Sequence, residues 1–118
     1  MLLPNKKYNI IYADPPWHFE NWNNKTAQTN PNQHYPTMTM KDIANMKVND
    51  IAADDCVLFM WCTDPLLHKQ LPIVENWGFK YKTVAFHWVK TNKDKTKNYY
   101  FKGPGYWTRA NNEICVLA

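Results

Sequence analysis

The chain has 118 residues and a formal net charge of +4, with 45% hydrophobic and 15% aromatic residues. This length predicts one small domain over residues 1–118, and the apolar content excludes an intrinsically disordered chain. No apolar run approaches the ~20 residues that cross a bilayer, and the first residues lack the apolar stretch of a secretory signal. We therefore expect a cytoplasmic protein that does not bind membranes.

Cysteine, histidine and glycine usage excludes several kinds of site. Cys56, Cys62 and Cys115 fall within apolar runs without C-x-x-C spacing, which predicts buried reduced thiols rather than disulfides or a zinc site. The four histidines show no ligand spacing, so we expect no metal. With only three glycines, the chain has no G-x-G-x-x-G turn and no phosphate-binding P-loop.

The first predicted element is a buried strand over residues 8–13, which are apolar and β-favouring. It ends at Asp14-Pro15-Pro16, because two prolines cannot continue a strand ladder. Residues 17–36 are rich in Asn, Thr, Gln and Pro and predict a long polar loop. Loops of this length in compact domains are usually functional or mobile.

A helix and a second strand are expected next. Residues 39–47 predict a helix with Thr39 as its N-cap and Asp42 in the position of a capping-box acid. Residues 49–55 predict a polar, solvated turn that contains three acids. The continuous apolar run over residues 56–61 predicts a central strand that is covered on both faces.

A second helix is expected over residues 64–77. Asp64 is placed as its N-cap, with Pro65 at the first helical position and Gly78 at the terminating position. Pro72 lies inside this helix and is expected to kink or split it.

Two further strands are expected over residues 80–90 and 113–118. In the first of them, Val84, Phe86 and Trp88 alternate with polar residues, which predicts one apolar face. Strands that alternate with helices in this order predict an α/β sheet packed by helices. Such a sheet rarely ends on a strand with nothing after it, so we expect it to be incomplete at the C-terminus. Three tryptophans are expected in the core: Trp61, Trp77 and Trp88.

Positive charge is concentrated between residues 80 and 109, where eight lysines and arginines accompany one aspartate. Part of this segment, over residues 91–107, predicts a basic loop. Its aromatic residues are Tyr99, Tyr100, Phe101, Tyr106 and Trp107. Cations interleaved with aromatic rings suit a nucleic acid, which is a polyanion with stackable bases. A solvated lysine-rich loop is the equally weighted alternative.

Asp14 stands at the carboxyl end of the first predicted strand, where ligands collect in open α/β sheets. An amine on a flat ring suits this set of groups. The set consists of the Asp14 carboxylate, the proline-fixed carbonyls without an obligatory internal partner, and the Trp17 ring. The oxygens accept hydrogen bonds from the –NH2 group, which leaves the nitrogen lone pair freer to attack. Stacking of an indole on a base contributes about 1–3 kcal/mol. The alternative is a plain Pro-Pro turn with Trp17 in a core.

Asp14-Pro15-Pro16-Trp17 matches the D-P-P-[WYF] signature of amino-methyltransferases that act on nucleic acids. Further stretches match in the same order: His34–Met38, Leu58–Trp61 with Thr63, Asn76–Phe79, Trp88–Thr91, and Gly105–Arg109 with Asn112-Glu113. On these motifs, nearly all of residues 8–118 resembles the MT-A70-like adenine N6-methyltransferases of the kind found in phages and prophages.

The resemblance implies a Rossmann-like methyltransferase sheet with permuted motif order, and methyl transfer from S-adenosylmethionine to adenine N6 in DNA. By this likeness, Asp14 and the Pro15 carbonyl hold the target amine in a loop fixed by Pro16, and Trp17 packs on the base. Asp14 also lies beside the methionine amine of the cofactor, and Asn112 makes a polar cofactor contact. The substrate-binding residues would be Trp17, Tyr35, Lys93, Lys95, Lys97, Lys102, Tyr106 and Arg109.

Members of this family continue beyond the strand equivalent to residues 113–118, which implies that a further segment or a partner supplies the rest of the cofactor site. The partner would be a second subunit or a second copy of the chain. Besides a DNA adenine methyltransferase, two functions stay open: an RNA adenine N6-methyltransferase, and a catalytically incomplete module that binds nucleic acid or another subunit. The expected location is the cytoplasm of a bacterium or of a phage-infected host cell.

Overall fold

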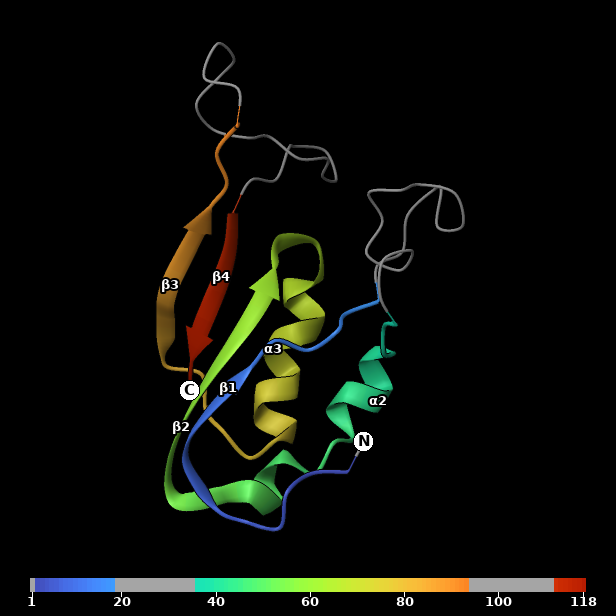
Figure 1. The fold of residues 1–118 in the computed structure, drawn as a ribbon, viewed down its shortest axis with the longest axis vertical. Helices are drawn as coiled ribbons and strands as arrows, with labels where there is room; N and C mark the ends of the chain where they lie inside the picture. Colours follow the sequence, from blue (N-terminus) through green and yellow to red (C-terminus); the bar gives the residue numbers. More distant parts are fainter. Residues whose placement is uncertain (1, 19–35, 94–111) are drawn as a thin grey trace.

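The computed structural model of the protein describes residues 2–18, 36–93 and 112–118 (Figure 1). The predicted polar loop and the predicted basic loop therefore lie mostly outside the described residues. Within the described ranges, no helix is long and apolar enough to cross a bilayer.

The described strands form one mixed sheet of four strands, in the order β1-β2-β4-β3. β1 (Tyr8–Ala13) pairs in parallel with β2 (Ala52–Thr63). β4 (Asn112–Leu117) runs antiparallel between β2 and β3 (Thr83–Val89). β1, β2 and β3 therefore point the same way, and their carboxyl ends share one end of the sheet with the start of β4. The α/β class predicted from the order of elements is confirmed.

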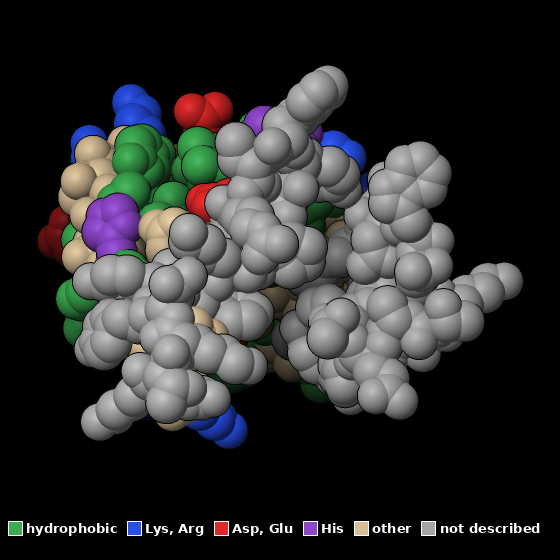
Figure 2. All heavy atoms as spheres, turned by 90° about the horizontal axis from the view of Figure 1, so that it is seen from above, with side chains coloured by type: hydrophobic (Ala, Val, Ile, Leu, Met, Phe, Trp, Pro, Cys, Tyr) green, Lys and Arg blue, Asp and Glu red, His purple; other side chains and the backbone are tan. Residues whose placement is uncertain are grey.

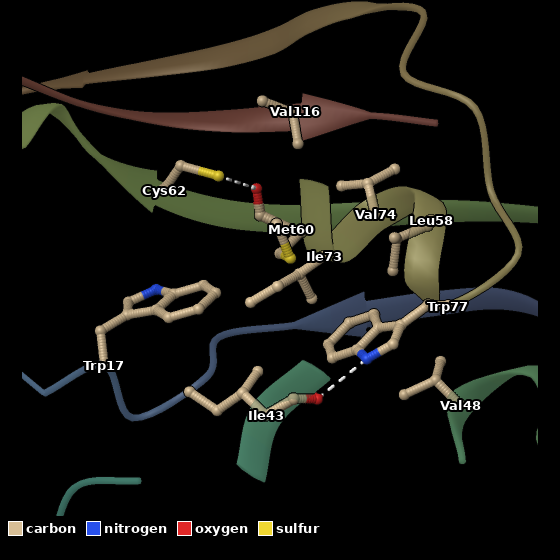
Figure 3. Close-up of a cluster of buried hydrophobic side chains, with 10 residues drawn as sticks. All are labelled: Trp17, Ile43, Val48, Leu58, Met60, Cys62, Ile73, Val74, Trp77 and Val116. Carbon is tan, nitrogen blue, oxygen red and sulfur yellow. Dashed lines mark hydrogen bonds between the residues drawn. The ribbon is translucent and has the colours of Figure 1, made fainter. Parts of the chain in front are cut away.

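Both helices cover the same face of this sheet (Figure 1). α2 (Met40–Ala44) and α3 (Leu67–Asn76) are amphipathic, and their apolar sides meet alternate residues of β2 and β4. The buried cluster drawn in Figure 3 contains Trp17, Ile43, Val48, Leu58, Met60, Cys62, Ile73, Val74, Trp77 and Val116. Burial of apolar area at about 25 cal/mol per Å² makes this cluster the main stabilising element of the described fold.

The predicted helix starts and stops are partly confirmed. Thr39 caps α2 as expected, because its Oγ1 accepts a hydrogen bond of 3.1 Å from the Asp42 amide. Asp64 is not the N-cap of α3, since a short 3-10 turn over Asp64–Leu66 precedes the helix. Pro72 lies within α3, which continues through it to Asn76.

Gly78 ends α3 as predicted, with a backbone φ of +90°. The Phe79 amide donates to the Val74 carbonyl at 3.0 Å, and the Gly78 amide donates to the Glu75 carbonyl at 2.9 Å. These bonds satisfy carbonyls at the helix end that would otherwise lack partners. The position also lies close to Asn49, because a Cβ on Gly78 would be 3.0 Å from the Asn49 side-chain oxygen.

β2 is longer than the apolar run predicted. It begins at Ala52, so Asp54 and Asp55 lie in a strand rather than in a turn. The pairing register between β1 and β2 shifts between Tyr8 and Ile10. The exposed acids lie in the stretch of β2 that this irregularity leaves without regular pairing. The described helices cover one face of β2, and on its other face Phe59 and Trp61 are half-buried, so coverage of both faces stays a prediction.

β3 departs from simple alternation. Its register against β4 shifts between Val84 and Phe86, so Val84 lies opposite the core residue Val116 whereas Phe86 lies opposite Cys115. Phe86 and Trp88 consequently point to the face without helices and are 58% and 53% exposed. The prediction that Trp88 is a core residue is therefore wrong.

The other tryptophan and cysteine predictions fare differently. Trp77 is buried, as predicted, and its indole N–H donates to the Ile43 carbonyl at 3.0 Å (Figure 3). Trp61 is only half-buried. All three thiols are free, with Cys62 and Cys115 buried. Burial, with a smaller contribution from Cys115, raises the pKa of Cys62 to about 12, which keeps this thiol protonated at neutral pH.

Candidate active site

Asp14 directly follows β1 at the carboxyl end of the parallel strands, where the sequence places it. Its side chain is exposed, yet the surrounding protein excludes part of its water and raises the pKa of the carboxyl above the ordinary value of 3.8. A carboxylate that has already lost part of its solvation is well placed to accept a hydrogen bond from a ligand. Figure 2 looks onto this end of the molecule, where described side chains of every coloured kind lie around the grey segments.

The two prolines after Asp14 hold a bent backbone whose carbonyls both have partners. The Trp17 amide donates to the Pro15 carbonyl at 2.9 Å, and the Met38 amide donates to the Pro16 carbonyl at 2.8 Å. The expectation of free proline carbonyls is therefore wrong. Each carbonyl oxygen has a second lone pair, whose direction the existing bonds fix. The Pro15 residue itself is buried, whereas Asp14 is exposed.

Trp17 lies in the core rather than on an open surface. Its side chain is 4% exposed and packs in the cluster with Met60 and Ile73 (Figure 3). The indole N–H donates to the Trp61 carbonyl at 3.2 Å, and the backbone pairs with Met38 in a parallel bridge. This placement favours the alternative in which Trp17 is a core residue. Trp17 thus anchors the loop over residues 14–17 to the carboxyl end of β2.

The carboxyl end of β2 is held by a second contact that sequence reasoning missed. Gln70 of α3 is fully buried, and its side-chain oxygen accepts from the Thr63 amide at 2.9 Å. The Gln70 amide group donates to the Thr63 hydroxyl at 3.2 Å. A polar residue on the apolar stripe of a helix is the signal that could have indicated this contact. These two hydrogen bonds satisfy the buried side chain of Gln70 and fix the end of β2, next to Asp14, against α3.

Tyr12 is another residue near the site that the sequence analysis did not single out. It is 69% exposed on the face without helices, two residues before Asp14. Its hydroxyl accepts a hydrogen bond of 2.6 Å from the indole N–H of Trp61. The signal was available in the alternation of β1, since Ile10 and Tyr12 must face away from Ile11 and Ala13.

Asn112 lies at the same end of the sheet as Asp14, because β4 starts where β2 and β3 end. Its amide group lies 3.5 Å from Nδ1 of His87. β2 separates β4 from β1, so Asn112 lies two strand spacings to the side of Asp14 and about three residues further along the sheet, roughly 14 Å away. Cys115 of β4 is level with Asp14, and burial and, to a smaller extent, the charge of Asp14 raise the pKa of its thiol.

The remaining predicted substrate residues divide into two groups. Lys93 is exposed beyond the carboxyl end of β3, at the same end of the sheet. His18, which is not among the predicted substrate residues, follows the 14–17 loop, and its Nδ1 lies 3.0 Å from the Thr37 hydroxyl. The others lie outside the described residues: Tyr35, Lys95, Lys97, Lys102, Tyr106 and Arg109.

Other possible sites in the described part of the chain carry less chemistry. Two shallow polar hollows lie near Asn49, at the opposite end of the sheet from Asp14, and neither is lined by a residue of the 14–17 loop. Among the described residues, no three side chains of His, Cys, Asp or Glu converge as a metal site would require. Asp14 and its rigid loop therefore form the candidate site with the most specific geometry.

Comparison with known proteins adds an independent observation. The sequence model of the MT-A70 family matches residues 8–118. The chain is 40% identical over 130 aligned residues to the Type II methyltransferase M.MunI of Mycoplasma sp, an alignment that covers 98% of this chain and 52% of M.MunI. It is 33% identical over 88 residues to the N6-adenosine-methyltransferase non-catalytic subunit MTB of Arabidopsis thaliana, covering 74% of this chain and 11% of MTB. The chain thus spans about half the length of M.MunI and a smaller part of MTB.

Proposed function

Because the chain belongs to the MT-A70 family, we propose that it forms the amine-binding part of an S-adenosylmethionine-dependent adenine N6-methyltransferase that acts on DNA. The observation that carries this proposal is the position of Asp14. It combines a partly desolvated carboxylate, a strand end shared with β2 and β3, and a loop fixed by two backbone hydrogen bonds.

Asp14 acts on the target nitrogen through hydrogen bonding. The exocyclic amine of adenine is a poor nucleophile because its lone pair is delocalised into the ring. When the carboxylate accepts one N–H bond and the second lone pair of the Pro15 carbonyl accepts the other, electron density at the nitrogen rises. The Pro15 carbonyl is held in place before the base arrives by its bond to the Trp17 amide, which limits the reorganisation that is needed as charge develops. A base inside a duplex would have to be flipped out to reach them.

Trp17 contributes to this function through position rather than through stacking in the described conformation. Its indole fixes the 14–17 loop against β2, and Gln70 fixes the end of β2 itself. Both are positioning residues, because they set where the Asp14 carboxylate lies without contacting the base.

The residues at this end of the sheet fit part of S-adenosylmethionine. Asp14 could accept a hydrogen bond from the ammonium group of the methionine portion, and the Asn112 amide could bind another polar group. The cofactor would supply a methyl group activated on a positively charged sulfur. The acidic and amide groups of this chain would bind and orient it next to the target amine.

Binding to a nucleic acid is supported by the positive charge of the chain. The cations between residues 80 and 109 would neutralise phosphates, which makes binding dependent on salt and independent of sequence. This term is the same for DNA and RNA strands, so the choice between them requires a direct assay.

A non-catalytic module is the second candidate function, and one comparison favours it. The chain is 33% identical over 88 residues to a protein named a non-catalytic subunit. In that case the Asp14 loop would bind a base or a neighbouring subunit without methyl transfer.

An assay with labelled S-adenosylmethionine separates these functions. The full-length methyltransferase that contains this chain is incubated with matched DNA and RNA oligonucleotides that contain adenine, and N6-methyladenine is measured in each, with Asp14→Ala as the control. Label in DNA that depends on Asp14 is the expected result. Label in RNA alone would support the RNA enzyme, and bound cofactor without label in either strand would support the non-catalytic module.

A further inference from the structure

The base that Asp14 would bind has no stacking partner in Trp17. Both Ala13 and Trp17 pack in the cluster that the helices cover, whereas Tyr12 and Asp14 are exposed. A residue that precedes a proline keeps an extended backbone, so the alternation of β1 continues through Asp14 and places its side chain on the other side of the strand from Ala13. The Trp17 ring therefore lies on the wrong side of β1 to stack on a base that this carboxylate holds.

Tyr12 is the aromatic residue that β1 carries on the same side as Asp14. Side chains two residues apart on one face of a strand are separated by about 7 Å. Tyr12 pairs with Phe59 of β2, but its hydroxyl accepts a hydrogen bond from Trp61, two residues further along that strand. By the same register, Trp61 is level with Asp14. The Tyr12 ring thus leans toward the carboxyl end of the sheet, beside Asp14.

Trp61 holds the Tyr12 ring in this direction although the ring is 69% exposed. The Trp61 indole N–H donates to the Tyr12 hydroxyl at 2.6 Å, and the indole meets the Trp88 ring edge to face with centroids 6.4 Å apart. The backbone carbonyl of Trp61 accepts from the Trp17 indole at 3.2 Å. An exposed ring that is already fixed loses little conformational freedom when a ligand stacks on it.

The charge of Asp14 acts on this same face of the sheet. Cys115 of β4 lies directly opposite Trp61 of β2, and directly opposite residues of paired strands share a face. Burial and, to a smaller extent, the charge of Asp14 raise the pKa of the Cys115 thiol. The carboxylate and the Tyr12 ring can therefore contact one ligand from the same side.

We propose that Tyr12 is the residue on which the target base stacks, with the base lying flat on the phenol ring while Asp14 accepts a hydrogen bond from the exocyclic amine. This inference rests on the proposed function and names the residue that holds the ring of the substrate. Trp61 is a positioning residue, because it acts through Tyr12. A purine overlaps the phenol ring more than a pyrimidine does, so the stack favours adenine over cytosine, which also carries an exocyclic amine.

The test compares single-stranded DNA oligonucleotides that are identical except at one central position, which holds adenine, cytosine or an abasic site. Their affinities for the full-length methyltransferase that contains this chain are measured by fluorescence anisotropy. Tyr12→Leu removes the flat ring and should lower the preference for adenine over the abasic site about tenfold, and lower the preference for adenine over cytosine as well. Tyr81→Leu is the matched control, since Tyr81 is also an exposed tyrosine but precedes β3.

Two milder variants test the role of the hydrogen bond between Tyr12 and Trp61. Tyr12→Phe and Trp61→Phe each remove one partner of this bond and keep an aromatic ring. Each should lower the adenine preference less than Tyr12→Leu does. Because both variants lose the same bond, the double variant should lose no more than the larger of the two single losses. Additive losses would contradict the positioning role of Trp61. Circular dichroism verifies that all variants fold.

The outcomes separate this inference from the proposed function. An adenine preference that Asp14→Ala abolishes but Tyr12→Leu leaves unchanged would overturn the stacking role while the function of Asp14 stands. Equal losses in Tyr12→Leu and Tyr81→Leu, or a loss of affinity that is the same for adenine and for the abasic site, would also overturn it. A native protein without any preference for adenine over the abasic site would contradict both proposals.

Discussion

Asp14 is an exposed side chain whose carboxyl is nonetheless partly desolvated. Its contribution to stability can therefore be separated from its contribution to binding. Exposed residues contribute little to packing, whereas partial desolvation leaves a carboxylate with unused capacity to accept hydrogen bonds. The two roles can be measured independently.

Asp14→Ala should abolish methyl transfer while changing the free energy of unfolding by no more than about 0.5 kcal/mol, the usual range for surface substitutions. The reason is that the substitution removes an acceptor for the target amine and no core volume. Transfer to DNA and denaturant unfolding of both proteins provide the two measurements. Asp42→Ala, which alters an exposed carboxylate on α2, is the control and should retain activity. Equal loss of activity in both variants would remove the special role of Asp14.

The pKa of Asp14 predicts two opposite dependences on pH. Because the folded pKa is raised above its ordinary value, the ionised carboxylate is less favourable in the folded state than in the unfolded state. Protonation therefore adds stability as the pH falls through the folded pKa, whereas adenine binding is lost over the same range. Asp14→Asn should be at least as stable as the native protein at neutral pH, and this difference should disappear in acid. A native protein that loses stability relative to Asp14→Asn as the pH falls would show that the pKa is lowered instead.

Substitutions of Trp17 test whether this residue anchors the loop over residues 14–17. Trp17→Ala should cost about 3–5 kcal/mol of unfolding free energy, as truncation of buried large aromatics does. Trp17→Phe keeps much of the volume but loses the hydrogen bond to the Trp61 carbonyl, which contributes about 1 kcal/mol. Denaturant titration measures both. A stable Trp17→Ala variant that has lost only base binding would restore the stacking role.

At the scale of elements, local sequence signals predicted where helices begin and end. The register in which strands pair could not be predicted from such signals. The Thr39 cap and the Gly78 terminus depend on a few neighbouring residues, so they could be recognised in the sequence. The outward direction of Trp88 depends on the shift in register against β4, which no local pattern reveals. Trp61 and Trp88 were expected in the core, but both lie on the face without helices, where Trp61 is half-buried and Trp88 is 53% exposed.

The same division applies to the site. The position of Asp14 at a strand end could be predicted from the two prolines that follow an apolar run. The family resemblance is confirmed by the match over residues 8–118. The roles of Asp14 and Asn112 remain predictions. The contact between Gln70 and Thr63 could not be foreseen, because it exists only once α3 folds back onto β2.

Gly78→Ala should destabilise the protein by about 1–2 kcal/mol, the cost of a left-handed backbone for a residue with a Cβ. Contact with the Asn49 side chain should add to this cost. Adding Asn49→Ala removes the contact but leaves the backbone strain, so the double variant should recover only part of the loss. Thermal unfolding of the single and double variants measures this partition. Full recovery in the double variant would mean that φ of Gly78 is not the cause.

At the scale of the whole molecule, the described fold is one-sided. Helices and core residues lie on one face of the sheet, and aromatic residues lie exposed on the other. Asp14 lies at the end of the sheet that contains the carboxyl ends of β1, β2 and β3. The hydrogen bonds of Trp17 and Gln70 connect the loop over residues 14–17 and the end of β2 to the covered face. The face without helices leaves large aromatic side chains exposed.

The most direct test of amine recognition is an NMR titration of the chain with two short single-stranded oligonucleotides. One contains a central adenine, and the other contains N6,N6-dimethyladenine at that position, which has no N–H to donate. Adenine should shift the amide signals of Ala13, Asp14 and Trp17, and both the dimethylated base and Asp14→Ala should abolish these shifts. Equal shifts with the two oligonucleotides, or shifts that persist in Asp14→Ala, would contradict the account.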